Sequence, residues 1–156
     1  MFDLFHVLLL LHIGGAIIGI GPTFAFGLMT PMMQKASVEG SRWIYEALVA
    51  INTKMVWPVL VLQPITGALL IFESGRNEDF LSQEWLWIAI VIYAVLFGLA
   101  IFVDRPRQNE LLQMTRSGDI DNPRYQTLRR QQDRLGMQLG LMVVVIIVLM
   151  ITKPGT

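Results

Sequence analysis

The chain has 156 residues, of which 54% are hydrophobic and 15% are charged, and its formal net charge at pH 7 is zero. A soluble domain usually carries about 25% charged residues, so this chain has too little polar surface to cover a water-soluble core. Because cysteine is absent, disulfides, thiolate metal sites, iron–sulfur clusters and thiol nucleophiles are excluded. The composition predicts an integral membrane protein.

Four stretches without Asp, Glu, Lys or Arg follow one another along the chain. They cover residues 4–29, 55–72, 85–103 and 135–152. A helix needs about 20 residues to cross the hydrocarbon core of a bilayer, and an amphipathic run at 42–52 is expected to lengthen the second stretch at the membrane surface. The sequence therefore predicts an all-α fold, a four-transmembrane-helix bundle, with spans at about 4–29, 48–72, 85–103 and 135–152. We expect one domain over residues 1–156.

The basic residues favour one orientation, because Lys and Arg in short loops are retained on the cytoplasmic side. The first and third connections carry most of them: Lys35, Arg42, Arg105, Arg107, Arg116, Arg124, Arg129, Arg130 and Arg134, with Lys54 at the start of the second span. The other side has Arg76 and Lys153 beside Asp3, Glu73, Glu78, Asp79 and Glu84. We predict that both termini lie outside, that a basic cytoplasmic loop joins spans three and four, and that the first span is retained rather than cleaved as a signal.

The third connection has clear helix boundaries. Pro106 after Asp104 suits a first helical position, the segment 117–119 is expected to end that helix, and Asn122 with Pro123 begins the next. The basic residues that follow are expected to face anionic lipid headgroups, each contributing about 1 kcal/mol. They are Arg124, Arg129, Arg130 and Arg134. We expect the bilayer, and no nucleic acid, as their partner, since the aromatic residues typical of single-strand binding are not interleaved with them.

One side of the first span carries an unusual set of small and polar residues. Residues three and four apart share this side: Phe5, Leu8, His12, Gly15, Gly19, Thr23 and Phe26. Gly15 and Gly19 form a small-xxx-small pair, which lets a neighbouring helix or a flat ligand approach the backbone. His6 lies on another side, where we expect it to anchor at the headgroups, so the two histidines cannot bind one metal ion from this helix.

Depth in the bilayer predicts the partners of His12. It lies about 12 Å inside the outer edge, at about 1.5 Å per residue. The same depth selects Gln63 and Thr66 on the second span and Tyr93 on the third. Pro64 has no N–H and releases the carbonyl of Leu60, which then needs another donor. We predict a polar layer of His12, Gln63, Thr66 and Tyr93.

Two interpretations of this layer stay open. In the structural one, His12 donates to a carbonyl or to Gln63 and fastens helices together. In the functional one, His12 is the axial metal ligand of b-type haem or another porphyrin, and the glycines leave room for the macrocycle. The cofactor-binding set would be His12, Gly15, Gly19, Gln63, Thr66 and Tyr93.

Other functions also fit the sequence. A non-catalytic accessory subunit of a homo- or hetero-oligomer would dock helices on small residues such as Gly136 and Gly140. A small permease would need a water-accessible cavity around Gln63. The methionines at 29, 32 and 33 are ordinary apolar side chains, with Cu(I) binding as the alternative. No nucleophile–base pair or phosphate-binding loop is present in the sequence, so a hydrolase is not expected, and whether the protein is an enzyme stays open.

Motifs spread over nearly the whole chain carry a family resemblance. They are Leu11-His12-Ile13-Gly14-Gly15-Ala16, Gly21-Pro22-Thr23-Phe24, Trp57-Pro58, Thr66-Gly67 and Leu149-Met150-Ile151-Thr152-Lys153-Pro154. They resemble a family of small bacterial integral membrane proteins of unknown function, which implies a four-span bundle in the bacterial cytoplasmic (inner) membrane.

That family is in turn similar to the copper-resistance-D-like membrane proteins, which include the J-type protoporphyrinogen oxidase, a haem-binding enzyme with a histidine early in its first span. By this resemblance His12 matches that histidine. The lysine of the oxidase has no match here, and Lys54 does not replace it.

Overall fold

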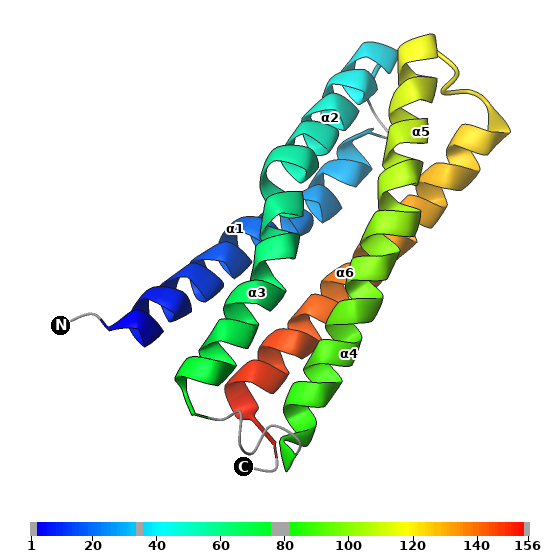
Figure 1. The fold of residues 1–156 in the computed structure, drawn as a ribbon. Coiled ribbons are helices and arrows are strands. Elements are labelled where there is room, and N and C mark those ends of the chain that lie inside the picture. The colour runs from blue at the N-terminus through cyan, green and yellow to red at the C-terminus, as the bar shows by residue number, and fades with distance from the viewer. Residues whose placement is uncertain (1–2, 34–35, 76–81, 155–156) are drawn as a thin grey trace.

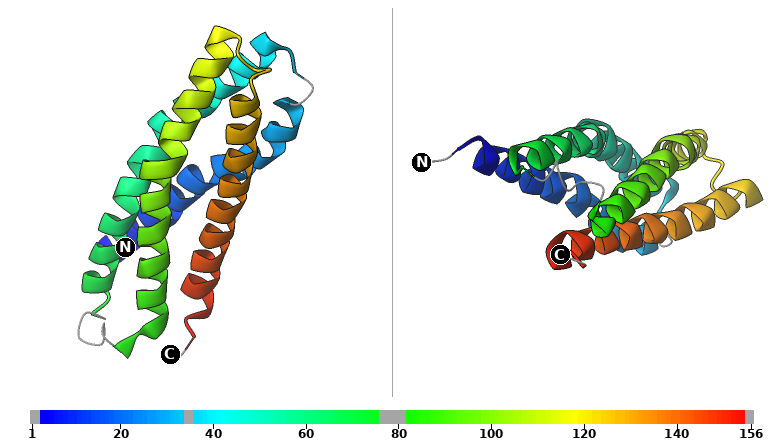
Figure 2. Two further views of the ribbon diagram at one scale, coloured as in Figure 1. Left: turned by 90° about the vertical axis from the view of Figure 1, so that its right-hand side faces the viewer. Right: turned by 60° about the horizontal axis from the view of Figure 1, so that its bottom comes forward.

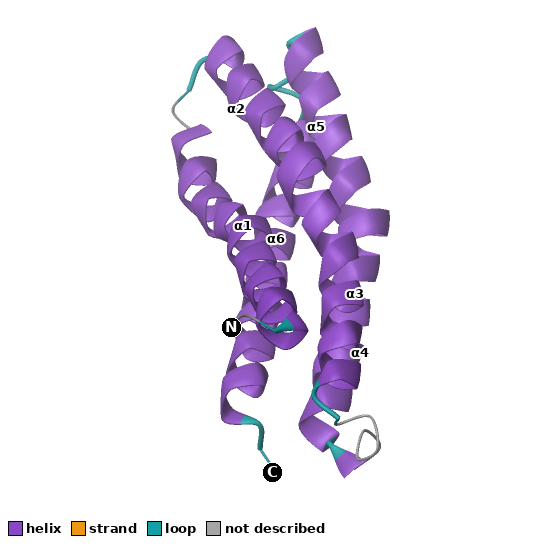
Figure 3. Ribbon diagram, turned by 60° about the vertical axis from the view of Figure 1, so that its left-hand side comes forward, coloured by secondary structure: helices purple, strands orange, loops and turns teal. Residues whose placement is uncertain are grey.

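The computed structural model describes residues 3–33, 36–75 and 82–154, with the side chains of residues 27–33 outside the described part. Within these ranges every regular element is a helix (Figures 1 and 3). The α-helices are α1 (Leu4–Met33), α2 (Val38–Ile51), α3 (Trp57–Glu73), α4 (Glu84–Leu99), α5 (Arg105–Ser117) and α6 (Pro123–Thr152). Two π-helical turns, η1 (Asn52–Val56) and η3 (Ala100–Asp104), join α2 to α3 and α4 to α5.

These elements form four long helices. Helices over Leu4–Phe26, Val38–Glu73, Glu84–Ser117 and Pro123–Thr152 are each long and apolar enough to cross a membrane. The all-α fold with four membrane-length helices is confirmed. Part of the evidence for sidedness lies outside the described residues: Lys35, Arg76, Glu78 and Asp79.

Neighbouring helices run in opposite directions. α1 packs most extensively on α3, and α4 packs on α6. α1 is inclined to the other helices and lies at one side of the bundle (Figure 2). The chain ends at the same end of the bundle as the connection from α3 to α4, opposite the turn that joins α5 to α6 (Figure 1).

Two of the long helices extend beyond a bilayer core. The Val38–Glu73 helix has 36 residues and the Glu84–Ser117 helix has 34, so each is roughly 50 Å long against a core of about 30 Å. The excess length of these two helices is α2 and α5. Together with the first turns of α6 they form a region that we call the polar tip (residues 38–51, 105–117 and 123–134). The main buried core lies inside this tip: Tyr45, Leu48, Leu111, Leu112 and Tyr125.

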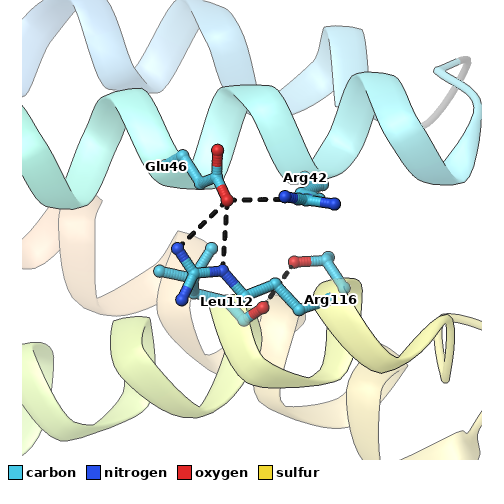
Figure 4. A network of polar contacts seen from close by, with 5 residues as sticks. Arg42, Glu46, Leu112 and Arg116 are labelled. Carbon is cyan, nitrogen blue, oxygen red and sulfur yellow. Dashed lines mark hydrogen bonds and ion pairs between the residues drawn. The ribbon is translucent and has the colours of Figure 1, made fainter.

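An ion-pair cluster holds α2 against α5 in the polar tip. Arg42 Nε lies 3.1 Å from Glu46 Oε1, and Arg116 Nη2 lies 3.0 Å from the same oxygen. Figure 4 shows the two guanidinium groups on either side of this carboxylate. Donation from Arg42, with further donation from Arg116, holds the pKa of Glu46 below its usual range. Glu46 precedes the membrane span at 48–72.

Each π-helical turn ends two residues before a proline. Trp57 N–H donates to Asn52 O and precedes Pro58, while Arg105 N–H donates to Ala100 O and precedes Pro106. A proline ring collides with the carbonyl four residues earlier in an α-helix, and a wider π turn relieves such a collision without breaking the helix. α5 thus begins at Arg105 with Pro106 in its first turn, as predicted, but η3 joins it to α4 without a break in the Glu84–Ser117 helix.

The other boundaries predicted in the third connection are confirmed. Gly118 ends α5 in the left-handed conformation at φ 81°, which a glycine adopts without strain. Asn122 caps α6, and its side chain accepts from Arg124 N–H at 2.9 Å. At the start of the chain, Asp3 caps α1 by accepting from His6 N–H at 3.1 Å.

The basic residues of α6 are only partly free for lipid. Arg124 Nε lies 2.6 Å from Glu110 Oε1, so its charge is neutralised within the protein. Arg129 is buried in the polar tip, with 8% of its surface exposed, which leaves little of it for contact with the headgroups that the sequence assigned to it. Arg130 and Arg134 are exposed, and contact of these two with anionic lipid stays a prediction.

Candidate functional site at the α1–α3 contact

The structure brings together five of the six predicted site residues where α1 crosses α3. His12, Gly15 and Gly19 come from α1, and Gln63 and Thr66 come from α3. Each contacts the opposite helix through a hydrogen bond or close packing. Tyr93 reaches α3 from α4 instead. His12, Gln63 and Thr66 thus meet at one level, and Tyr93 contacts α3 at Leu60, three residues before Gln63.

The His12 imidazole is oriented by Thr66. Its Nδ1 lies 2.8 Å from Thr66 Oγ1. Thr66 Oγ1 is also 3.1 Å from two acceptors of its own helix, Leu62 O and Gln63 O. A hydroxyl has one proton, and a helical threonine typically donates it to such carbonyls. This favours the tautomer in which Thr66 accepts from Nδ1–H, which leaves the lone pair on Nε2. No protein partner of Nε2 is recorded among the described residues.

Gln63 forms the second polar contact between these helices. Its Nε2 donates to the His12 main-chain oxygen at 3.0 Å. Its other atom, Oε1, is buried and has no hydrogen-bond partner within the described part of the chain. A buried polar atom left without a partner costs about 1–3 kcal/mol. The layer therefore has an unused acceptor next to His12, in addition to the His12 Nε2 lone pair.

The glycines of α1 serve helix packing. A Cβ placed on Gly19 would lie 2.6 Å from Val59 Cγ1, and one on Gly15 would lie 3.7 Å from the same atom. The side chain of Val59 thus occupies the space beside Gly19. The sequence predicted that the glycines leave room for a macrocycle. Beside Gly19 this space between the helices is filled by Val59 instead.

Gly67 makes room for the imidazole, and the sequence-based set of site residues omitted it. A Cβ on Gly67 would lie 3.3 Å from His12 Cε1, which is tighter than ordinary contact. Its position directly after Thr66 was the available signal, because a small residue beside a polar one marks a close approach of helices.

Tyr93 satisfies the carbonyl that Pro64 releases. Its hydroxyl donates to Leu60 O, and its ring stacks on Phe97 with the centroids 6.3 Å apart. α3 and α4 make few close backbone approaches, so a long side chain is needed to connect them. The predicted layer therefore consists of two hydrogen bonds between α1 and α3 and one between α4 and α3.

Further metal ligands are not gathered around His12. No group of three or more His, Cys, Asp or Glu residues that could hold a metal ion is found among the residues described. His6 is exposed at the start of α1, where its Nδ1 lies 2.5 Å from Asp3 Oδ1. The methionine side chains at 29, 32 and 33 lie outside the described residues.

The sequence analysis missed a second polar network, at the two π-helical turns. Asn52 Nδ2 donates to Gln108 Oε1 at 2.7 Å, and Gln108 Nε2 donates to Asp104 Oδ2 at 2.7 Å. Gln132 Nε2 from α6 donates to Asp104 Oδ1. The signal was Asp104 at the end of an apolar stretch with Gln108 one turn later, since side chains four residues apart meet on a helix.

Comparison with known proteins gives the family. The sequence profile of the DUF2269 family, which is described as predicted integral membrane proteins, matches residues 6–154. The chain belongs to this family. The family resemblance in the sequence is thereby confirmed, whereas the more distant relation to the copper-resistance-D-like proteins stays a prediction. No curated protein and no solved structure matches the chain. Family membership and the four apolar helices establish a multi-pass integral membrane protein.

Proposed function

We propose that this DUF2269 family member binds b-type haem in the membrane, with His12 Nε2 as an axial ligand of the iron. The observation that carries the proposal is the imidazole whose Nδ1–H is bound to Thr66 and whose Nε2 has no protein partner among the described residues. A hydrogen bond from the second ring nitrogen is how proteins orient a ligating histidine and raise its basicity. Iron held there would supply electron-transfer or oxygen chemistry.

The packing limits where a porphyrin fits. Val59 fills the space beside Gly19, so the macrocycle cannot lie between α1 and α3. His12 is only half-buried, and several α1 neighbours, including Leu11 and Ile13, are exposed. The exposed flank of the imidazole is therefore the side open to a ligand. Within the described part of the chain no second histidine shares this level, so this chain supplies one histidine ligand, and a second ligand would be a methionine, Tyr93 or a residue of a second copy.

We also propose which membrane the protein spans and on which side of it the polar tip lies. The basic residues of α2, α5 and the first turns of α6 support cytoplasmic placement of the polar tip. Both termini would then lie outside, in the cytoplasmic membrane of a bacterium. Membrane-impermeant labelling of single cysteines introduced at Ser117 and Thr152, in this cysteine-free chain, tests this: only the second is expected to react from outside intact spheroplasts.

Absorption spectroscopy tests haem binding. Protein purified from haem-replete cells is expected to show a Soret band that is lost in His12→Ala and retained in His6→Ala, the matched control. Thr66→Val keeps the shape of the side chain but removes the Nδ1 partner, and we expect about 10–100-fold weaker haem binding. A colourless wild-type preparation that is folded by circular dichroism contradicts the proposal.

An accessory subunit is the second candidate, and the surface of α6 favours it. Neither Gly136 nor Gly140 has any atom within 4 Å of an added Cβ, and Met137 and Leu141 beside them are exposed. Another membrane helix could approach this face closely. Photo-crosslinking from position 137 is expected to trap one defined membrane protein if this role holds, and to give only lipid adducts if it does not.

A permease has less support from the packing. Gln63 donates to the backbone of α1 and lies against Gly15, so its amide group serves a helix contact. If a cysteine introduced at position 63 reacts with water-soluble reagents, a permease function is supported. If this cysteine is completely protected from them, a permease function is contradicted.

A further inference from the structure

A polar pocket lies where the Val38–Glu73 and Glu84–Ser117 helices make their π-helical turns. The residues that line it include Asn52, Thr53, Trp57, Arg105, Gln108 and Asn109. The buried Asn52 forms its floor, while Thr53, Arg105 and Asn109 are exposed at its mouth. Single π-helical turns inside α-helices frequently mark functional sites. Here η1 supplies Asn52 and Thr53 to the pocket, and α5, which directly follows η3, supplies the residues from Arg105 onward.

Arg105 supplies the pocket with a positive charge. Its guanidinium carbon lies 5.3 Å from the centre of the Trp57 ring, and stacking on an aromatic face holds such a group in place without neutralising it. No ion pair of Arg105 with a carboxylate is recorded in the part of the chain that the structure describes. Its N–H groups are therefore available to a bound anion.

The carboxylate of Asp104, the residue before Arg105, is bound to other partners. Asp104 accepts from Gln108 and Gln132, one on each oxygen, and Arg107 lies close enough to attract it electrostatically. Gln108 in turn accepts from Asn52 at 2.7 Å. This chain of amides separates Asp104 from the mouth of the pocket and fixes the polar floor.

We propose that this pocket binds a phosphate group at the membrane surface. The guanidinium of Arg105 is the fork that pairs with phosphate oxygens, and Thr53 and Asn109 add hydroxyl and amide donors. The pocket sits at the ends of the apolar stretches 55–72 and 85–103, the level of lipid headgroups. The phosphate belongs to an anionic lipid or to a soluble phosphate compound, and the proposal is independent of haem binding at His12.

Isothermal titration of the detergent-solubilised full chain tests this with two probes at matched ionic strength. One is short-chain dihexanoyl phosphatidic acid, and the other is inorganic phosphate. We expect saturable binding, weakened about tenfold by Arg105→Gln. Asn109→Asp, which places a negative charge at the exposed mouth, is expected to weaken binding as well. Arg42→Gln removes an exposed arginine of the polar tip that pairs with Glu46 outside the pocket, and it is expected to leave binding unchanged.

The two probes separate the sources of the phosphate. Binding of the lipid alone assigns the pocket to a headgroup, and binding of inorganic phosphate assigns it to a soluble compound. The proposal is overturned if neither probe binds saturably, or if Arg42→Gln weakens binding as much as Arg105→Gln. Should Arg105→Gln not fold by circular dichroism, unchanged binding in Asn109→Asp overturns it equally.

Discussion

Tyr93 donates a hydrogen bond to the main-chain oxygen of Leu60, the carbonyl that Pro64 leaves without its helical donor. In water such a carbonyl would be solvated, but in a bilayer it must find a partner within the protein. A tyrosine on the next helix supplies that donor across a gap that few backbone atoms approach. The proline therefore creates the attachment point that joins α3 to α4.

Tyr93→Phe should lower the free energy of unfolding by about 0.5–1.5 kcal/mol, because interhelical hydrogen bonds in membranes contribute amounts of this order. Reversible unfolding in mixed micelles measures it. In a Pro64→Ala background position 64 regains an N–H that can donate to Leu60 O, so Tyr93→Phe should cost almost nothing there. An equal cost in both backgrounds would show that the hydroxyl does not serve this carbonyl.

Gly19→Ala should destabilise the contact of α1 with α3 by about 1–3 kcal/mol, because the added methyl group collides with Val59. Gly14→Ala on the same helix is the matched control, since nothing lies within 4 Å of its added Cβ. Combining Gly19→Ala with Val59→Ala should recover part of the loss. Equal melting temperatures of the two single variants would refute this packing.

Asp104→Ala should cost about 1–3 kcal/mol, because it leaves the amide groups of Gln108 and Gln132 without their acceptor. The exposed Asp121 offers a control of the same residue type, and Asp121→Ala should change stability by less than about 0.5 kcal/mol. Thermal unfolding of both variants in detergent checks the difference. Similar effects would mean that the network does not hold the π-helical turns together.

The ion-pair cluster around Glu46 should weaken in acid. Its pKa is lowered in the folded protein relative to the ordinary value of 4.5, so its stabilising contribution is present above that value and is lost as the pH falls through the lowered pKa. The difference in melting temperature between wild type and Glu46→Gln should therefore be constant near neutral pH and shrink below about pH 4.5. High salt should shrink it too. A difference independent of both pH and salt would contradict this.

Much of the fold follows from the sequence because the bilayer imposes it. A charge-free stretch long enough to cross has to be a helix, and a fixed rise per residue relates depth on one span to depth on the next. That is why His12, Gln63 and Thr66 could be placed at one level. The need of the Leu60 carbonyl for a donor was likewise readable from Pro64.

Other features depend on how the helices pack, which the sequence pattern does not encode. A proline predicts a break, and only the surrounding helices determine that Pro106 is accommodated by a π-helical turn. A glycine permits close approach, but it does not say that Val59 rather than a ligand fills the space beside Gly19. The Asp104 network draws side chains from three long helices, whose rotations relative to one another leave no local signal.

The protonation of the His12 ring tests the account most directly. Nitrogen-15 magnetic resonance of histidine-labelled His6→Gln protein in bilayers observes the His12 ring alone, before any ligand is added. The account predicts a neutral imidazole with its proton on Nδ1 and a bare Nε2. A ring protonated on Nε2, with Nδ1 accepting from Thr66, would contradict it.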